Sequence, residues 1–130
     1  MGETRIIGEA APQSVEPVLD CEQIDGLVAA AGVEGAREIL SAFWRSTDTL
    51  FRALQEQLSG GDLAEAARTA HALKGSSLNV GALRLSAAAR AIEECCKRQD
   101  PASALQRLGG AEAGYAETVA AFDAHLSAAA

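Results

Sequence analysis

The sequence predicts an all-α protein, an antiparallel up-down four-helix bundle with a short extra helix at its N-terminus. Three observations favour this fold class. Apolar residues recur at steps of three and four along several segments, which is the period of a helix with one buried face. Aromatic residues make up only 4% of the 130 residues and β-branched residues are sparse, so a sheet is disfavoured. The breaks between the segments are short, as they are between antiparallel helices of a bundle.

The N-terminal region divides into a tail and the start of the bundle. Residues 1–18 contain two prolines and show no apolar period, so we expect a disordered or loosely ordered tail. The remainder, residues 19–130, is long enough to bury a core and forms one domain. Its first element is a short helix from about Leu19 to Ala30, with Asp20 as the N-cap and Gly32 closing the helix.

A long helix is expected from Glu34 to Leu58. Its apolar stripe consists of residues at helical spacing: Ile39, Phe43, Thr47, Leu50, Leu54 and Leu58. We interpret Trp44 and Phe51 as residues that pack against the first helix, because no other feature suggests a cofactor site. The glycines after Ser59 end the helix, and Asp62 caps the next one.

The following helix, from Leu63 to about Asn79, has two different faces. Its inward stripe is narrow and made mostly of small residues: Leu63, Ala66, Ala70, Leu73 and Ser77. His71 lies on the opposite side, so its ring should point to water. Gly75 follows one turn later and costs the helix roughly 1 kcal/mol relative to alanine. Bare backbone beside His71 would let another molecule come close. Asn79 or Gly81 can end the helix in a left-handed conformation.

Two further helices complete the expected bundle. The first runs from Ala82 to Arg98, and the second begins at Pro101. The inward residues of the first are Leu85, Ala88, Ile92 and Cys95 or Cys96, and those of the second are Leu105, Leu108, Tyr115, Val119, Phe122 and Leu126. Glycines at 109, 110 and 114 weaken the second helix, so we expect a kink or a frayed start there.

Composition limits the classes of partner. The net charge of −7 disfavours nucleic acid, whose binding needs clustered basic residues. The charges of residues 62–78 sum to zero and those of residues 79–111 to +2, so the histidine region is the least acidic part of the chain. This distribution favours an acidic partner. No long exposed apolar stripe remains once the core is assigned, so we expect a monomer.

The sequence also indicates the compartment. No run approaches the ~20 apolar residues that a membrane span needs, and the N-terminus lacks a basic region followed by an apolar one, so we expect neither membrane insertion nor secretion. The odd count of three cysteines (Cys21, Cys95 and Cys96) favours a reducing environment. The expected location is cytoplasmic, and the sequence shows no metal site.

A motif of specific spacing surrounds the histidine. The run from His71 to Ser77, followed by Gly81 and Ala82, resembles the signature H-x-L-K-G-S-S-x-x-x-G-A of histidine-containing phosphotransfer (HPt) domains, with seven fixed residue types beyond the histidine. The resemblance extends more loosely over about residues 19–128. It implies a phosphorelay intermediate of two-component signal transduction, in which His71 accepts a phosphoryl group from a receiver-domain aspartyl phosphate and passes it to another receiver aspartate.

The residues around His71 fit this chemistry. A neutral imidazole has a nitrogen lone pair for nucleophilic attack. Lys74 and Arg68 each lie one turn from His71 and can stabilise the phosphoryl oxygens. A partner would dock on exposed backbone and small apolar side chains of the same face, at Ala64, Ala67, Gly75 and Leu78.

The missing motifs are informative as well. The chain has no glycine-rich phosphate loop and no kinase signature, so we expect no ATP binding and no autonomous kinase activity. It also has no aspartate cluster for Mg²⁺. We therefore expect no cofactor of its own, and Mg²⁺ on the receiver domain of a response regulator. The other expected partners are sensor or hybrid histidine kinases.

Two other functions remain open from the sequence. The chain could be a non-catalytic helical adaptor that docks a signalling partner through the same face. It could also be the dimerisation domain of a histidine kinase, although Ala72 replaces the acidic residue that usually follows the histidine of such domains. The second histidine, His125, has no lysine or glycine motif beside it, so we interpret it as a surface residue without a role.

Overall fold

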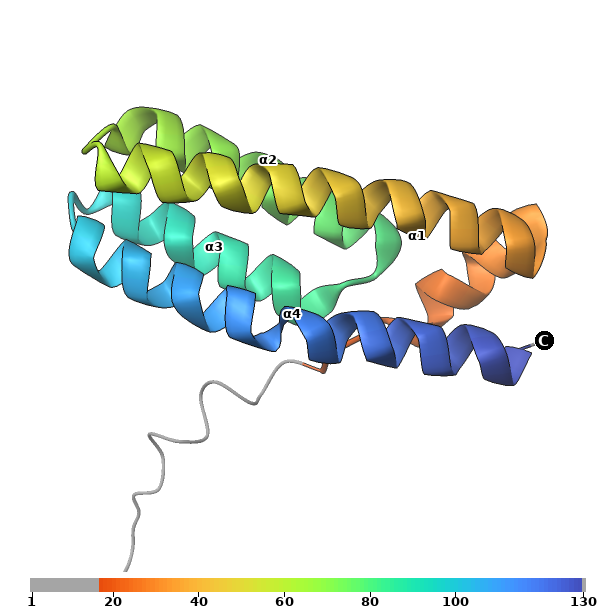
Figure 1. Cartoon of the computed structure of the whole chain (residues 1–130). Coiled ribbons are helices and arrows are strands. Elements are labelled where there is room, and N and C mark those ends of the chain that lie inside the picture. Colours follow the sequence, from red (N-terminus) through yellow and green to blue (C-terminus); the bar gives the residue numbers. More distant parts are fainter. Residues whose placement is uncertain (1–16, 130) are drawn as a thin grey trace, which may run out of the picture.

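The computed structural model describes residues 17–129, which form an antiparallel bundle of four helices. The helices are α1 (Cys21–Ser59), α2 (Leu63–Val80), α3 (Leu83–Lys97) and α4 (Pro101–Ala129). Each helix packs against the next, and α4 returns to pack against α1 (Figure 1). No strand occurs within residues 17–129. The predicted fold class is confirmed, whereas the predicted tail lies almost wholly outside the described residues.

The short extra helix is the first part of α1. The backbone at Gly32 has φ 77° and ψ 168°, which is not helical, and the chain changes direction there (Figure 1). Glycine populates this region at little cost. Asp20 caps the segment, since its carboxylate accepts a hydrogen bond from the Gln23 amide at 3.3 Å. The predicted start and break are therefore confirmed.

The short N-terminal segment is bonded to the end of α2. The Asp20 amide donates to the Gly81 carbonyl at 2.8 Å, and the Gln23 side chain donates to the Asn79 carbonyl at 2.8 Å. Gly81 has φ 84° and ends α2 in the left-handed conformation. A Cβ at Gly81 would also lie 3.1 Å from the Asp20 carbonyl oxygen. Both the backbone angle and this close approach therefore favour glycine at the position.

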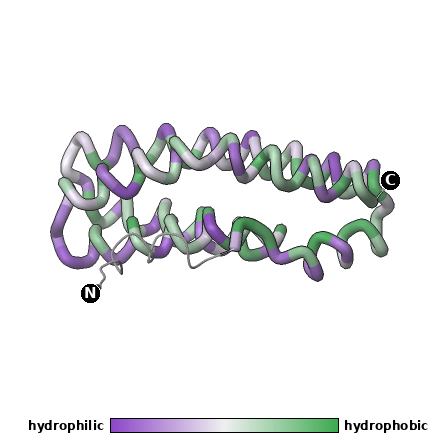
Figure 2. Tube along the Cα trace, turned by 90° about the horizontal axis from the view of Figure 1, so that it is seen from below, coloured by the Kyte–Doolittle hydropathy of each residue, from purple (hydrophilic) through white to green (hydrophobic). Residues whose placement is uncertain are grey.

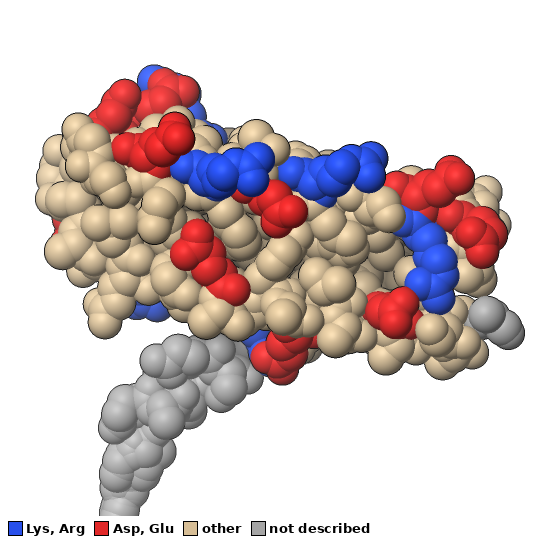
Figure 3. All heavy atoms as spheres, in the orientation of Figure 1, with Lys and Arg blue, Asp and Glu red and all other residues tan. Residues whose placement is uncertain are grey.

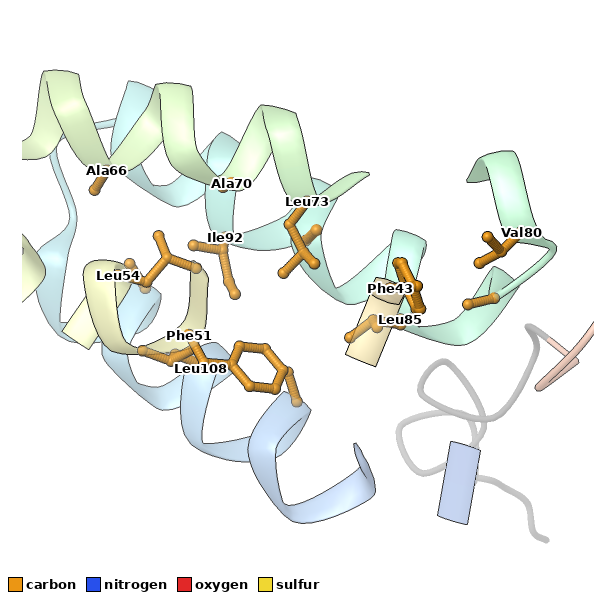
Figure 4. Close-up of a cluster of buried hydrophobic side chains, with 14 of the residues drawn as sticks. Phe43, Phe51, Leu54, Ala66, Ala70, Leu73, Val80, Leu85, Ile92 and Leu108 are labelled. Carbon is orange, nitrogen blue, oxygen red and sulfur yellow. The ribbon is translucent and has the colours of Figure 1, made fainter. Parts of the chain in front are cut away.

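The core lies along the axis of the bundle and takes side chains from every helix. Fully buried leucines and isoleucine from four helices meet there, at Leu54, Leu73, Ile92 and Leu108 (Figure 4). Hydrophobic and hydrophilic residues alternate along each helix, as amphipathic elements require (Figure 2). Both Cys95 and Cys96 are buried, which is consistent with the predicted inward face of α3.

At some predicted core positions the buried residue is the next one in the sequence or the one before it. Ile39 is 41% exposed, and Leu40 is buried in its place. Likewise Ala89 of α3 is fully buried, whereas Ala88 is only half-buried. Most of each predicted stripe is correct, since Phe43, Leu54 and Leu58 of α1 and Leu85 and Ile92 of α3 are buried. At the Ile39 and Ala88 positions two apolar residues are adjacent, so the helical period could not decide which of the two is buried.

The aromatic residues of α1 pack against α4, which the sequence did not predict. The Trp44 ring contacts Tyr115 and Phe122 edge-on, with centroids 5.7 and 5.3 Å apart, and Phe51 contacts Tyr115 at 5.4 Å. Tyr115 also donates a hydrogen bond to the Trp44 carbonyl at 3.1 Å. Burial raises the pKa of Tyr115 to about 12, so it remains a donor at physiological pH. The prediction that Trp44 and Phe51 pack against the first helix is therefore wrong, because their rings contact Tyr115 and Phe122 of α4.

Helix α4 has no break at its glycines. Residues 101–129 are helical throughout, so the predicted frayed start is wrong. The Asp100 carboxylate accepts a hydrogen bond from the Ser103 amide at 3.1 Å and so holds the first turn. Hydrogen bonds from Ser103 also lower the pKa of Asp100. Among the described residues, no helix has the length and apolar character to cross a membrane.

Candidate functional site

His71 lies near the middle of α2 with its ring turned outward. The helix buries Ala66, Ala70, Leu73, Ser77 and Val80, which is close to the predicted stripe. The His71 side chain is 65% exposed on the opposite side. The predicted exposure of this ring is therefore confirmed.

A buried carboxylate on α3 holds the ring. Glu93 has a side chain only 8% exposed, and its Oε2 lies 3.1 Å from Nδ1 of His71. Two lysines contact the same carboxylate: Lys74 Nζ lies 3.3 Å from Oε1, and Lys97 Nζ lies 3.1 Å from Oε2. We call His71, Lys74, Glu93 and Lys97 the Glu93 cluster. It brings together two residues of α2 and two of α3.

The charges of the Glu93 cluster keep its carboxylate ionised. Burial by itself would raise the pKa of Glu93, but hydrogen bonds from Lys97, Lys74 and His71 outweigh it and lower that pKa. An ionised carboxylate can only accept hydrogen bonds. Nδ1 of His71 must therefore carry the proton that it donates to Glu93. In the neutral ring this leaves the lone pair on Nε2.

The two cations predicted beside His71 are both engaged in ion pairs. Lys74 is half-buried and bound to Glu93, one turn from the imidazole. Arg68 is exposed and pairs with Glu65 on its own helix, and this hydrogen bond raises the Arg68 pKa. The structure therefore brings Lys74 into the cluster with His71, whereas Arg68 stands outside it.

Comparison with known proteins identifies the family. The sequence model described as the Hpt domain matches residues 38–129, which is more than half of the chain. The chain belongs to the Hpt domain family. Its role is accordingly histidine phosphotransfer in two-component signalling.

Solved structures support the fold of the Hpt domain. The histidine-containing phosphotransfer protein B (HptB) of Pseudomonas aeruginosa PAO1 is 25% identical, with a TM-score of 0.78 over 85% of this chain and 96% of that one. A putative histidine-containing phosphotransfer protein from rice is 20% identical, with a TM-score of 0.75 and coverage of 85% and 82%. The protein MtHPt2 of Medicago truncatula is 21% identical, with a TM-score of 0.70 and coverage of 92% and 85%. No curated protein is similar enough to this chain to count as a match.

The residues predicted to dock a partner are accessible on the Hpt domain. Ala64 and Gly75 are exposed, Ala67 is half-buried, and Leu78 is 47% exposed. A Cβ built at Gly75 would meet nothing within 4 Å, so this glycine leaves open space above α2. Beside Leu78, a hollow lies between α2 and α3, lined by Lys74, Leu78, Leu83, Ser86, Ala87, Arg90, Ala91 and Glu94.

The face formed by α1 and α4 carries charges of both signs. Acidic and basic side chains are interspersed there (Figure 3). Arg37 of α1 and Asp123 of α4 form one of its ion pairs, at 2.8 Å. A surface of mixed sign provides no strong field for steering a charged partner.

His125 is not the free surface residue that the sequence suggested. Its side chain is only 26% exposed, and Nε2 lies 2.8 Å from Oδ1 of Asp25. The contact ties α4 to the short N-terminal segment of α1. His125 thus has a structural partner, one hundred residues away in sequence.

Sequence reasoning missed two residues of the Glu93 cluster, Glu93 itself and Lys97. Glu93 follows Ile92 in α3, and Lys97 lies in the last turn of that helix. Neither lies near His71 in sequence, and no local period marks them. The one available signal was the acidic residue beside the inward position Ile92, where a carboxylate needs a buried partner. Among the described residues, no group of three or more histidine, cysteine or acidic residues could hold a metal.

Proposed function

We propose that this Hpt domain is a phosphorelay intermediate that carries phosphoryl groups between receiver domains. His71 accepts the group from an aspartyl phosphate of one receiver and passes it to an aspartate of another. The observation that carries the proposal is the exposed His71 ring, held at Nδ1 by buried Glu93. Because Nδ1 is bonded to Glu93, the ring presents its Nε2 lone pair to an approaching protein. Nε2 has no hydrogen-bond partner among the described residues.

Nearby cations would stabilise the transferred group. Its three equatorial oxygens carry negative charge in the transition state. Lys74 is one turn from His71 and can turn from Glu93 toward these oxygens, while Lys97 continues to neutralise Glu93. Arg68 would approach from the other side by leaving Glu65. The receiver would supply Mg²⁺ and the aspartate, so this chain needs no cofactor of its own.

The docking surface would be the outward face of α2. Gly75 allows close approach of the receiver backbone, and Leu78 provides an apolar anchor beside it. Ala64 and Ala67 extend the surface toward the start of the helix. An interface made by a few residues of one helix would be small, which suits a transient encounter rather than a stable complex.

The adaptor hypothesis does not explain the Glu93 cluster. A helix that only docks a partner has no need of a carboxylate that is 8% exposed and bound to a solvent-facing imidazole. Burying a carboxylate is costly unless it is paired, and here the pairing serves to hold the ring. Under the relay hypothesis, the expected partners are response regulators and sensor or hybrid histidine kinases.

The test is phosphotransfer from a phosphorylated receiver domain in the presence of Mg²⁺. Wild type is expected to acquire label that is labile in acid and stable in alkali, as phosphohistidine is. His71→Gln should acquire none and keep the helical circular dichroism of wild type. His125→Gln is the matched control and should be labelled normally. Label that survives in His71→Gln would overturn the proposal.

A further inference from the structure

A groove of about 650 Å³ lies between α3 and α4. Its floor is formed by small residues of both helices: Ala87, Ala88, Ala91, Gly110 and Gly114. None of the residues that line it belongs to α2, so the groove is separate from the face that carries His71. Ala87 and Ala91 also line the hollow beside Leu78, so the groove and the hollow lie on either side of α3.

Two glycines of α4 keep the groove open although the helix does not need them. A Cβ at Gly110 or Gly114 would meet nothing within 4 Å, and neither glycine has a positive φ. Each costs the helix roughly 1 kcal/mol relative to alanine. Packing within the bundle and backbone conformation therefore do not explain these glycines. A segment whose backbone comes close to α4 would explain them, because a side chain at either position would occupy the groove.

The charges of the groove suit an acidic occupant. Among the described residues that line it, the two charged ones are arginines. Arg84 of α3 contacts Glu117 of α4 at 3.3 Å, so Arg84 lies level with the middle of α4. Arg107 lies ten residues before Glu117, which is about 15 Å along the helix. Arg107 has no ion-pair partner among the described residues. The groove thus has a basic group near each end.

The described part of the chain begins beside the same groove. Ala82, the N-cap of α3, makes no side-chain capping bond. The Val18 carbonyl instead accepts hydrogen bonds from the amides of Leu83 and Arg84, at 3.1 and 3.4 Å. These bonds place the first described residues at the Arg84 end of the groove. An extended chain spans about 3.3 Å per residue, so residues 9–16 are long enough to cover the distance between the two arginines.

We propose that residues 9–16 of this chain bind in the groove between α3 and α4. Glu16 pairs with Arg84 at one end, and Glu9 pairs with Arg107 at the other. A segment tethered this closely binds at a high effective concentration, so weak contacts are enough to hold it. The inference is independent of the relay function, and the bound segment lies beside the proposed docking surface without covering the phosphoryl acceptor.

The sequence of this segment fits the groove. Residues 1–16 contain three glutamates and one arginine, a net charge of −2, which is opposite in sign to the two arginines of the groove. Between the two glutamates the sequence is A-A-P-Q-S-V, without a charge, and Pro12 disfavours a helix in the residue before it. A guanidinium has five donors, so Arg84 can bind Glu16 without leaving Glu117.

The test uses the full chain with a nitroxide label on the segment and ¹⁵N nuclear magnetic resonance. Cys21 is exposed, whereas the other two cysteines are buried, so the label is attached through Gly8→Cys in a Cys21→Ser background. We expect the label to broaden the amide signals of residues 107–111, at the far end of the groove. The signals of residues 52–56, on α1, should broaden much less.

Matched variants of the labelled protein locate the contact. Gly110→Leu fills the floor of the groove and should remove the difference, whereas Gly109→Leu changes an equally open glycine that does not line the groove and should keep it. Arg107→Glu should lower the ratio of bound to unbound segment about fivefold. Adding Glu9→Arg to Arg107→Glu should restore the ratio, and Arg45→Glu, at an exposed arginine of α1, should leave it unchanged.

Three results would overturn the inference. The first is equal broadening of the groove and of α1 that neither Gly110→Leu nor the charge exchange alters. The second is broadening of the groove mainly between separate labelled and ¹⁵N-enriched molecules in a mixed sample, which would assign the groove to a second copy of the chain. The third is a groove whose signals respond only to an added receiver domain, which would assign it to that partner.

Discussion

The two histidines of this chain each contact a carboxylate, but the arrangements are opposite. At His71 the ring is 65% exposed and the Glu93 side chain is 8% exposed, and the contact is made through Nδ1. At His125 the ring is 26% exposed and the Asp25 side chain is 64% exposed, and the contact is made through Nε2. The anchored group is the carboxylate in the first pair and the ring in the second. A buried carboxylate leaves the outer nitrogen for chemistry, whereas a half-buried ring connects two segments.

Removing each ring should therefore give opposite outcomes, and this is the largest effect we expect. His71→Ala should abolish phosphoryl uptake and change the melting temperature little, because an exposed ring contributes little packing. His125→Ala should leave uptake unchanged and lower the free energy of unfolding by about 1 kcal/mol, the worth of one hydrogen bond. Transfer assays and thermal unfolding of both variants check this. Equal loss of uptake in both would show that the contrast is not functional.

Filling the open space beside His71 should have the next largest effect on transfer. Gly75→Leu should slow transfer from a receiver at least about tenfold, because the new side chain would occupy the docking surface. It should not destabilise the bundle, since a Cβ at Gly75 meets nothing and leucine is the better helix former by roughly 0.8 kcal/mol. Gly109→Leu in α4 is the matched control, with similar free space and no expected effect on transfer. An undiminished rate in Gly75→Leu would leave this glycine without a role in docking.

Replacing Lys74 of the Glu93 cluster should reduce transfer less than replacing His71 or Gly75. Lys74→Ala is expected to slow transfer or shorten the lifetime of phospho-His71 several-fold, because one charge that stabilises the phosphoryl oxygens is lost. Lys97→Ala should have a smaller effect, since Lys97 reaches His71 only through Glu93. Decay of the label in isolated phosphoprotein provides the measurement. Identical decay in wild type and Lys74→Ala, with identical transfer, would remove Lys74 from the site.

Acid should weaken the contribution of Glu93 to stability, and this is the smallest effect that we expect. Glu93 has a lowered pKa in the folded protein, so its ionised form contributes stability above its ordinary value of 4.5, and this is lost as pH falls through the lowered pKa. Glu93→Gln should therefore show a shallower loss of stability with falling pH than wild type. Urea unfolding at a series of pH values from about 6 downward checks this. Parallel curves for the two proteins would contradict it.

The features that sequence alone could predict are local ones. Asp20, Asp62 and Gly81 bound their helices as expected, because capping depends on residues within one turn. The exposure of His71 followed from the helical period, although the period could not choose between Ile39 and Leu40. Glu93 was out of reach because its partners lie on another helix. The ring contacts of Trp44 likewise depend on how α1 meets α4.

The bonds from Asp20 and Gln23 to the end of α2 have a consequence for the limits of the domain. The family match begins at residue 38, yet Asp20 and Gln23 satisfy the carbonyls of Gly81 and Asn79, about two to three turns beyond His71. A fragment cut to the matched residues would expose those carbonyls and free the C-terminal end of the histidine helix. The folded domain thus extends beyond the region that the family model matches, and its first residues bond to the end of the histidine helix from a distant part of the chain.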